Sequence, residues 1–181
     1  MKYFMMETDP DCITAPQIIY DQYQIDRRNI TSVDFHKINK RTLLYIKRDK
    51  NTIFTDVITN TFLLFSTQAF EIIKKYEPHI PSKQIVLLDE ENRRTEVYFL
   101  PLLLKAAPIS ENINDKQPNK LVLQSELIRD KNIFWVEGYS TLQPVISLDL
   151  AESLLRRGAR GLHLTEVSLR TDDYIKDGDV R

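Results

Sequence analysis

The stretch that most constrains the fold runs from Ile133 to Leu169, because each of its structural boundaries is marked in the sequence. An apolar run of strand-favouring residues begins at Ile133 and ends at Gly138. Ser147 is suited to cap a helix, since its hydroxyl can accept a backbone N–H of the first turn. Gly158 is suited to end that helix in a left-handed conformation. The stretch therefore predicts a strand, a turn, a capped amphipathic helix and a closing strand.

A similar order occurs earlier in the chain, where another apolar run precedes Ser66. Ser66 or Thr67 is expected to cap a second amphipathic helix, with a strand around Ile85 after it. The distance from serine to closing strand is 19 residues from Ser66 to Ile85, and 15 from Ser147 to Leu162. The two segments are either a duplicated unit or two ordinary strand-helix-strand segments, and the unequal spacing favours the second interpretation.

Further strands are predicted at Tyr3–Met6 and Glu96–Leu100, and the continuous apolarity of the latter indicates burial on both faces. Together the patterns predict an α+β fold, with a mixed or mainly antiparallel sheet and a few amphipathic helices. A chain of 181 residues that is 42% hydrophobic can bury one good-sized core. We therefore expect a single α+β domain over residues 1–169 and a polar, mobile tail over residues 170–181.

The charge balance argues against several classes of partner. The formal net charge is -1, with 25 basic and 26 acidic residues interspersed, which argues against nucleic-acid binding and attraction to membranes. The longest apolar region is broken by Pro101, Lys105 and Pro108 and is too short to span a bilayer. A single cysteine, Cys12, suits a reducing compartment. We expect a cytoplasmic protein, and its oligomeric state stays open.

Residues that could carry chemistry are few and scattered. The three histidines lie far apart in sequence, and none stands at metal-ligand spacing from another histidine or a cysteine. The four glycines do not form a phosphate-binding loop. We therefore predict no catalytic residues, no metal and no cofactor, and a protein that is not an enzyme. The alternative is an enzyme of unrecognised class that combines Glu90 or Glu96 with a histidine.

Aromatic residues give a more specific indication. Trp135, Glu137 and Tyr139 alternate along the strand that begins at Ile133 and its exit, so they share one face. Tryptophan and tyrosine are frequent anchors of protein interfaces. The alternative, that Trp135 is simply part of the core, is the more common outcome for such a residue.

Three segments also resemble a known family. They are YFLPLLLKAAPIS at residues 98–110, KLVLQSELIRDKNIFWVEG at 120–138 and PVISLDLAESLLRRGARGLHLTEV at 144–167. Their order resembles a family of small bacterial immunity proteins from polymorphic-toxin systems, the eleventh immunity family in the usual catalogue. The resemblance covers Thr55 to Leu169 and is carried by hydrophobic pattern and structural boundaries. It implies an internally pseudo-symmetric fold and so favours the duplicated unit.

The resemblance implies a non-enzymatic cytoplasmic protein that binds a cognate protein toxin and blocks its active site or its folding. Such binding needs aromatic anchors and complementary charge on an exposed surface. We therefore expect partner contacts at Trp135, Glu137 and Tyr139, and at Asn112 and Asp115 in the polar stretch 110–119. A self-associating structural or regulatory module, joined through a sheet edge at 97–104, is a further alternative.

Overall fold

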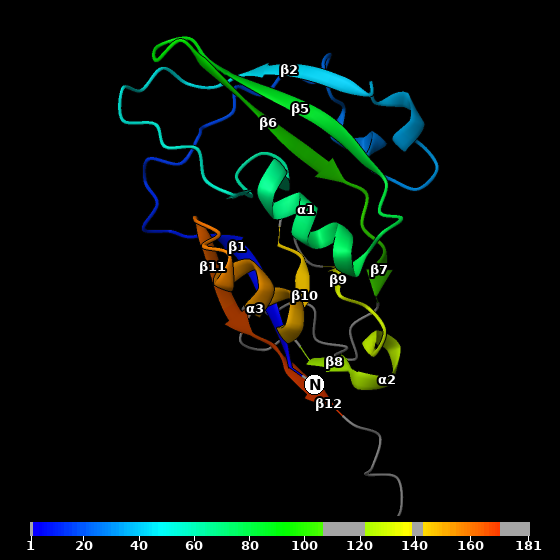
Figure 1. Cartoon of the computed structure of the whole chain (residues 1–181). Coiled ribbons are helices and arrows are strands. Elements are labelled where there is room, and N and C mark those ends of the chain that lie inside the picture. Colours follow the sequence, from blue (N-terminus) through cyan, green and yellow to red (C-terminus); the bar gives the residue numbers. More distant parts are fainter. Residues whose placement is uncertain (1, 107–121, 139–142, 171–181) are drawn as a thin grey trace, which may run out of the picture.

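A computed structural model describes residues 2–106, 122–138 and 143–170 (Figure 1). The fold is α+β, as predicted: two five-stranded sheets, a pair of short parallel strands and a few helices. Helices α1 (Thr67–Tyr76) and α3 (Leu148–Arg156) lie between the sheets, and their apolar faces share one buried cluster. No helix among the described residues is long and apolar enough to cross a membrane.

The first sheet is built from the middle of the chain and has the strand order β2-β5-β6-β4-β3. Strand β2 runs parallel to β5, and the other neighbours are antiparallel. One face of the sheet packs on apolar side chains from the N-terminal part of the chain, among them Ile18, Ile25 and Phe35. The strands are β2 (Arg41–Tyr45), β3 (Val57–Ile58), β4 (Leu64–Ser66), β5 (Ser82–Asp89) and β6 (Arg94–Pro101).

The second sheet combines the start of the chain with its C-terminal third, in the order β11-β1-β10-β9-β7. The first strand of the chain, β1, lies between β10 and β11 and is antiparallel to both (Figure 1). Strand β7 is parallel to β9. The strands are β1 (Tyr3–Thr8), β7 (Lys105–Ala106), β9 (Ile133–Val136), β10 (Val145–Ser147) and β11 (Leu162–Glu166).

The remaining elements are short. Strand β8 pairs in parallel with β12, and a single helical turn, α2, follows β8 directly. The elements are β8 (Val122–Gln124), β12 (Ser168–Arg170), α2 (Ser125–Ile128) and the 3-10 turns η1 (Arg27–Asn29) and η2 (Phe35–Lys37).

Both predicted helix caps are present. The Oγ of Ser66 accepts a hydrogen bond from the backbone N–H of Ala69 at 3.1 Å. The Oγ of Ser147 accepts one from the N–H of Leu150 at 3.4 Å. A serine at this position contributes about 1 kcal/mol to helix stability relative to alanine.

The two helices are antiparallel and touch at both ends. The hydroxyl of Tyr76, at the end of α1, donates a hydrogen bond to the carbonyl of Asp149 at 3.0 Å. At the other end, the amide of Gln68 donates to the carbonyl of Arg157 at 3.1 Å. Gln68 and Asp149 each stand two residues after their capping serine, and Tyr76 and Arg157 each stand ten residues after it. The two contacts therefore join equivalent positions of the two helices.

The equivalence extends to the strands. The first unit consists of β3, β4, α1, β5 and β6, and the second of β9, β10, α3, β11 and β1. Their strand orders, β5-β6-β4-β3 and β11-β1-β10-β9, are the same. Each capping serine lies opposite a tyrosine of the unit's central strand, Ser66 opposite Tyr98 and Ser147 opposite Tyr3. This shared order and register supports the duplicated-unit interpretation over two unrelated segments.

One polar residue before each hairpin joins the two units. The carboxylate of Asp56 accepts hydrogen bonds from the Oγ of Ser66 at 2.5 Å and from the N–H of Arg160, after α3, at 2.8 Å. The side-chain oxygen of Asn132 accepts from the Oγ of Ser147 at 3.3 Å, while its amide nitrogen contacts the residues that end α1. Each of these residues binds its own capping serine and the segment after the other unit's helix.

Two expectations for the segment after Glu96 are wrong. Tyr98 and Leu100 are buried, but Val97 is 38% exposed, so the segment is not buried on both faces. The ring of Phe99 stacks on that of Phe70 of α1 with 4.5 Å between centroids. The segment is also not a sheet edge along β6, since that strand lies between β4 and β5.

Candidate functional site

A groove of about 880 Å³ opens where the two sheets meet. It lies between the β3–β4 connection, the link from α1 to β5, the segment from β6 to β7, and strand β9. The 3-10 turn η1 forms part of its rim. Because these segments are distant in sequence, the groove exists only once both units have packed together.

The floor of the groove is apolar and consists mainly of buried side chains. Phe62 and Leu63 are buried, at 1% and 2% exposure, and reach the groove from the β3–β4 connection. Trp135 lines it from β9 and is 5% exposed. The backbone N–H of Trp135 donates to the carbonyl of Leu104 at 2.8 Å, which joins β9 to the segment before β7. Leu104 itself lines the groove with its side chain 72% exposed.

The rim carries more positive than negative charge. The groove is lined by four cationic side chains, those of Arg27, Arg28, Lys105 and Lys131, and by two carboxylates, those of Glu77 and Asp130. This local excess contrasts with the net charge of -1 of the whole chain. The groove therefore favours an acidic ligand, although the protein as a whole does not.

Two of these rim charges are already engaged. Arg28 pairs with Asp26 at 2.7 Å, and its hydrogen bonds hold the pKa of that carboxyl below the ordinary range. Glu77 accepts a hydrogen bond from the backbone N–H of Asn132 at 3.2 Å, so it is oriented towards the junction of the two units.

Arg27 is held differently. Its guanidinium lies over the ring of Tyr20, 4.6 Å from the centroid, and over that of Phe62, at 5.4 Å. Phe62 belongs to the floor of the groove, so Arg27 is fixed where floor and rim meet. A guanidinium stacked in this way keeps its N–H donors available for a carboxylate.

The predicted partner-binding residues have different outcomes. Trp135 is buried in the shared core and also lines the groove, so it combines the two interpretations. Glu137 follows β9, is exposed, and its backbone N–H donates to the carbonyl of Ala106 at 2.9 Å. Tyr139, Asn112 and Asp115 lie outside the described residues, as do residues 171–181 of the predicted tail 170–181, whose first residue, Arg170, belongs to β12.

The groups considered for an enzyme site are dispersed. His36, on η2, His79, in the link from α1 to β5, and His163, on β11, are all exposed. Glu90 pairs with Arg48 at 3.0 Å. Within residues 2–106, 122–138 and 143–170, no three metal-ligating side chains come together.

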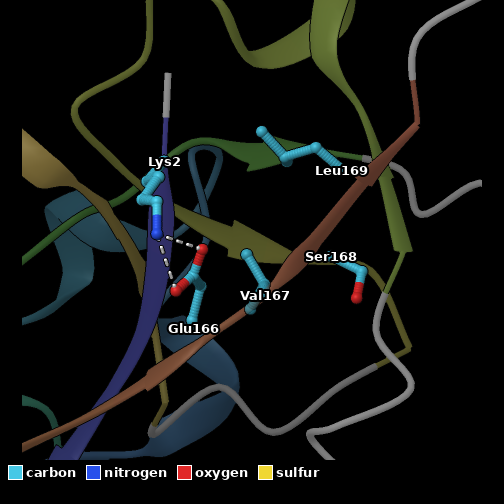
Figure 2. A pocket seen from close by; sticks show the side chains of 5 residues that line it. All are labelled: Lys2, Glu166, Val167, Ser168 and Leu169. Carbon is cyan, nitrogen blue, oxygen red and sulfur yellow. Dashed lines mark hydrogen bonds and ion pairs between the residues drawn. The ribbon is translucent and has the colours of Figure 1, made fainter.

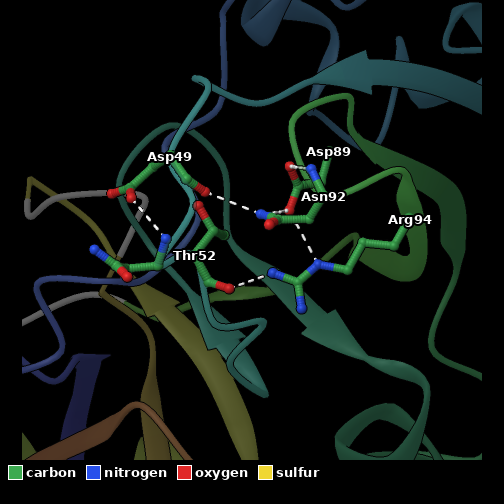
Figure 3. Close-up of polar contacts among 6 residues, drawn as sticks. Asp49, Thr52, Asp89, Asn92 and Arg94 are labelled. Atoms are coloured by element: carbon green, nitrogen blue, oxygen red, sulfur yellow. Dashed lines mark hydrogen bonds and ion pairs between the residues drawn. The ribbon is translucent and has the colours of Figure 1, made fainter.

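A polar cluster at the β5–β6 turn carries a buried charge (Figure 3). Asp89 is fully buried and pairs with Arg94 at 3.0 Å, while Asn92 donates a hydrogen bond to it at 2.8 Å. Burial raises the pKa of Asp89, but the hydrogen bonds from Asn92 and Arg94 outweigh it and hold that pKa below the ordinary value. Arg94 and Asn92 also bond the carbonyls of Thr52 and Asp49, so the cluster fastens a turn to the preceding loop.

A shallow hollow lies where β11 leads into β12 (Figure 2). Its charged groups are Lys2 and Glu166, whose side chains pair at 3.0 Å. Since the two charges compensate each other, the hollow offers little to a charged ligand.

Of the partner contacts expected from the sequence and described by the structure, Trp135 is the one that lines this groove. The sequence analysis singled out none of Arg27, Phe62 and Leu104. A scan against protein-family models finds no match, and a search of curated proteins finds none either. Similarity to known proteins thus assigns no role to any residue of this site.

Proposed function

We propose that this chain is a non-enzymatic immunity protein that acts in the cytoplasm by binding and neutralising a cognate protein toxin. The observation that carries the proposal is the apolar groove of about 880 Å³, with Trp135 in its floor and Leu104 exposed at its edge. The resemblance of three sequence segments to polymorphic-toxin immunity proteins supports the same conclusion.

The composition of the groove suits a protein partner. Apolar surface bordered by polar groups marks interaction sites on soluble proteins. Aromatic residues and arginine are the side chains that contribute most to protein interfaces, and the groove offers both in Trp135, Phe62 and Arg27. The floor residues Phe62, Leu63 and Trp135 are buried in the fold, so binding requires little ordering of the floor itself.

Neutralisation of this kind requires no reaction on this chain. The groove would hold a segment of the toxin, and the bulk of the immunity protein would then block the toxin's active site or its folding. The floor residues supply apolar contact, while the rim charges orient the partner and speed the encounter.

The test is to co-express this chain with the product of the gene immediately upstream, which we expect to encode the toxin. We expect cells to survive toxin expression only when this chain is present, and the two purified proteins to form a stable complex. Toxicity that persists at equal expression, with no complex in solution, would contradict the proposal.

A second candidate function, self-association, is favoured by one observation on the first sheet. Leu43 of β2 lies opposite Val86 of β5, which lies opposite Val97 of β6, so three apolar residues form a row across the strands. Leu43 is 43% and Val97 38% exposed. Self-association through this row predicts a dimer in light scattering that Leu43→Lys converts to a monomer, whereas a wild-type monomer would contradict it.

A further inference from the structure

We propose that the groove takes an amphipathic segment of its protein partner in which apolar side chains are combined with carboxylates. This inference rests on the proposed function, because it names the chemistry of the toxin segment that the groove holds.

The first argument is the exposed leucine at the edge of the groove. Leu103 is 6% exposed and belongs to the shared core, while the next residue, Leu104, is 72% exposed. Leu104 lies beside Trp135, whose N–H bonds its carbonyl. A partner side chain placed here would cover Leu104 and contact the floor at the same time, which is the arrangement of an interface anchor.

The second argument is the charge that remains after pairing. Arg28 is compensated by Asp26, and Glu77 is bonded to Asn132. Arg27, Lys105 and Lys131 form no ion pair among the residues that the structure describes, and they face one remaining carboxylate, that of Asp130. The three cations lie around an apolar floor.

Charge complementarity therefore selects a partner segment that brings carboxylates to the rim while its apolar side chains enter the groove. A basic segment would meet unpaired positive charge at the rim and be repelled.

The third argument is the orientation of Arg27. The rings of Tyr20 and Phe62 fix its guanidinium, so less side-chain freedom is lost when it binds. A planar guanidinium binds a carboxylate through two parallel hydrogen bonds, which a lysine cannot do. The position of Arg27 thus points to a carboxylate of the partner where the rim meets the apolar floor.

The experiment uses the full chain with the photo-crosslinking residue p-benzoylphenylalanine at Leu104. The matched control carries it at Leu155, which is 53% exposed on α3 and does not line the groove. The probe is the purified product of the upstream gene. We expect Leu104 to crosslink to one segment rich in apolar and acidic residues, and Leu155 to give little crosslinking.

Charge reversal provides the second measurement. Arg27→Glu combined with Lys105→Glu should weaken binding of the same probe about tenfold or more, mainly through a slower association rate at low salt. Lys47→Glu, an exposed lysine that follows β2 away from the groove, makes a matched control and should change affinity by less than about twofold. Arg27→Lys should restore only part of the affinity, because lysine lacks the planar pair of donors.

The outcomes separate the two proposals. If the probe binds but crosslinks through a basic or uncharged segment, or binds the charge-reversed variant as tightly as wild type, the partner chemistry proposed here is wrong and the proposed function stands. If crosslinks from Leu104 stay within this chain, the groove is filled by the chain itself and the inference is overturned. If the probe does not bind at all, both proposals fail.

Discussion

Tyr3 and Tyr98 occupy the same position in two equivalent units, each directly opposite the serine that caps its unit's helix. Both rings are buried, and both hydroxyls donate to a backbone carbonyl before the unit's hairpin. Tyr98 bonds Thr55 at 2.6 Å and Tyr3 bonds Ile128 at 2.5 Å. Tyr3 stands at the start of the chain, so the second unit is complete only when the first strand has inserted between β10 and β11.

Removing one phenol should therefore destabilise the fold. Tyr98→Phe leaves the carbonyl of Thr55 without this buried donor, and we expect the free energy of unfolding to fall by about 1–3 kcal/mol. Urea unfolding followed by circular dichroism measures the loss. Phe54→Tyr serves as the control variant. It changes an aromatic ring that neighbours Tyr98 by adding a hydroxyl, and it leaves the hydrogen bond of Tyr98 in place. Stability of Tyr98→Phe equal to wild type would show that this hydrogen bond contributes nothing.

Alkaline pH should act on the same groups. Burial raises the pKa of Tyr98 far above its ordinary value and also raises that of Tyr3. The unfolded chain loses these protons above about pH 10 while the folded chain keeps them, so stability is present below that pH and declines above it. We expect this decline above about pH 10 to be shallower in Tyr98→Phe. Equal slopes for both proteins would contradict the assignment.

Two glycines allow the stability cost of backbone strain to be separated from the cost of a steric clash. Gly161 has φ +74°, and a Cβ added there would lie 2.5 Å from the Cβ of Thr55. Gly158 has φ +73°, but a Cβ there would meet nothing within 4 Å. Gly158→Ala should cost about 1 kcal/mol from backbone strain alone, and Gly161→Ala clearly more, because the two units must also move apart. Thermal unfolding of both variants checks this, and equal losses would contradict the close approach.

Acid should weaken the cluster at the β5–β6 turn. The pKa of Asp89 is held below its ordinary value in the folded chain, so its contribution is present above about pH 4 and is lost as pH falls further. Asp89→Asn should lower stability by about 1–2 kcal/mol at neutral pH and reduce the further loss on acidification. Urea unfolding at neutral and acidic pH tests the prediction. An unchanged acid dependence in the variant would show that other carboxylates dominate it.

Leu104 separates binding from stability. Its side chain is 72% exposed, so Leu104→Ser should change the free energy of unfolding by less than about 0.5 kcal/mol. The same change should weaken toxin binding about tenfold or more if the groove is the contact surface. Leu155→Ser, 53% exposed on α3, is the matched control and should bind like wild type. Titration calorimetry with the product of the upstream gene measures both affinities.

Local signals in the sequence were sufficient for the parts of the fold that local interactions decide. Ser66 and Ser147 both cap helices as expected, because the hydroxyl and the N–H groups that it binds lie within one turn. The strand at Tyr3 was also predicted, but its place between β10 and β11 was not, since no local signal encodes a partner more than 140 residues away. The hydrogen bond between Asp56 and Arg160 was not predicted either, because these residues stand 104 positions apart in the sequence.

Less of the candidate site could be predicted from the sequence, because its residues also come together through the packing of distant segments. Trp135 was singled out by residue type; it lines the groove with 5% of its surface exposed, and its contact with a partner stays a prediction. Arg27 and Leu104 look like ordinary surface residues in the sequence. Only the packing of the two units brings them to one apolar groove, with Arg27 held over the ring of Phe62.

The most direct test uses Trp135, because it is the single tryptophan of the chain and lines the groove. Replacing it biosynthetically with 5-fluorotryptophan gives one fluorine resonance that reports on the surroundings of this side chain, which include the groove floor. We predict that adding the product of the upstream gene shifts this resonance and saturates at one equivalent, and that the charge-reversed variant Arg27→Glu with Lys105→Glu needs a higher concentration for the same shift. A complex that forms while the resonance stays unchanged would contradict the account.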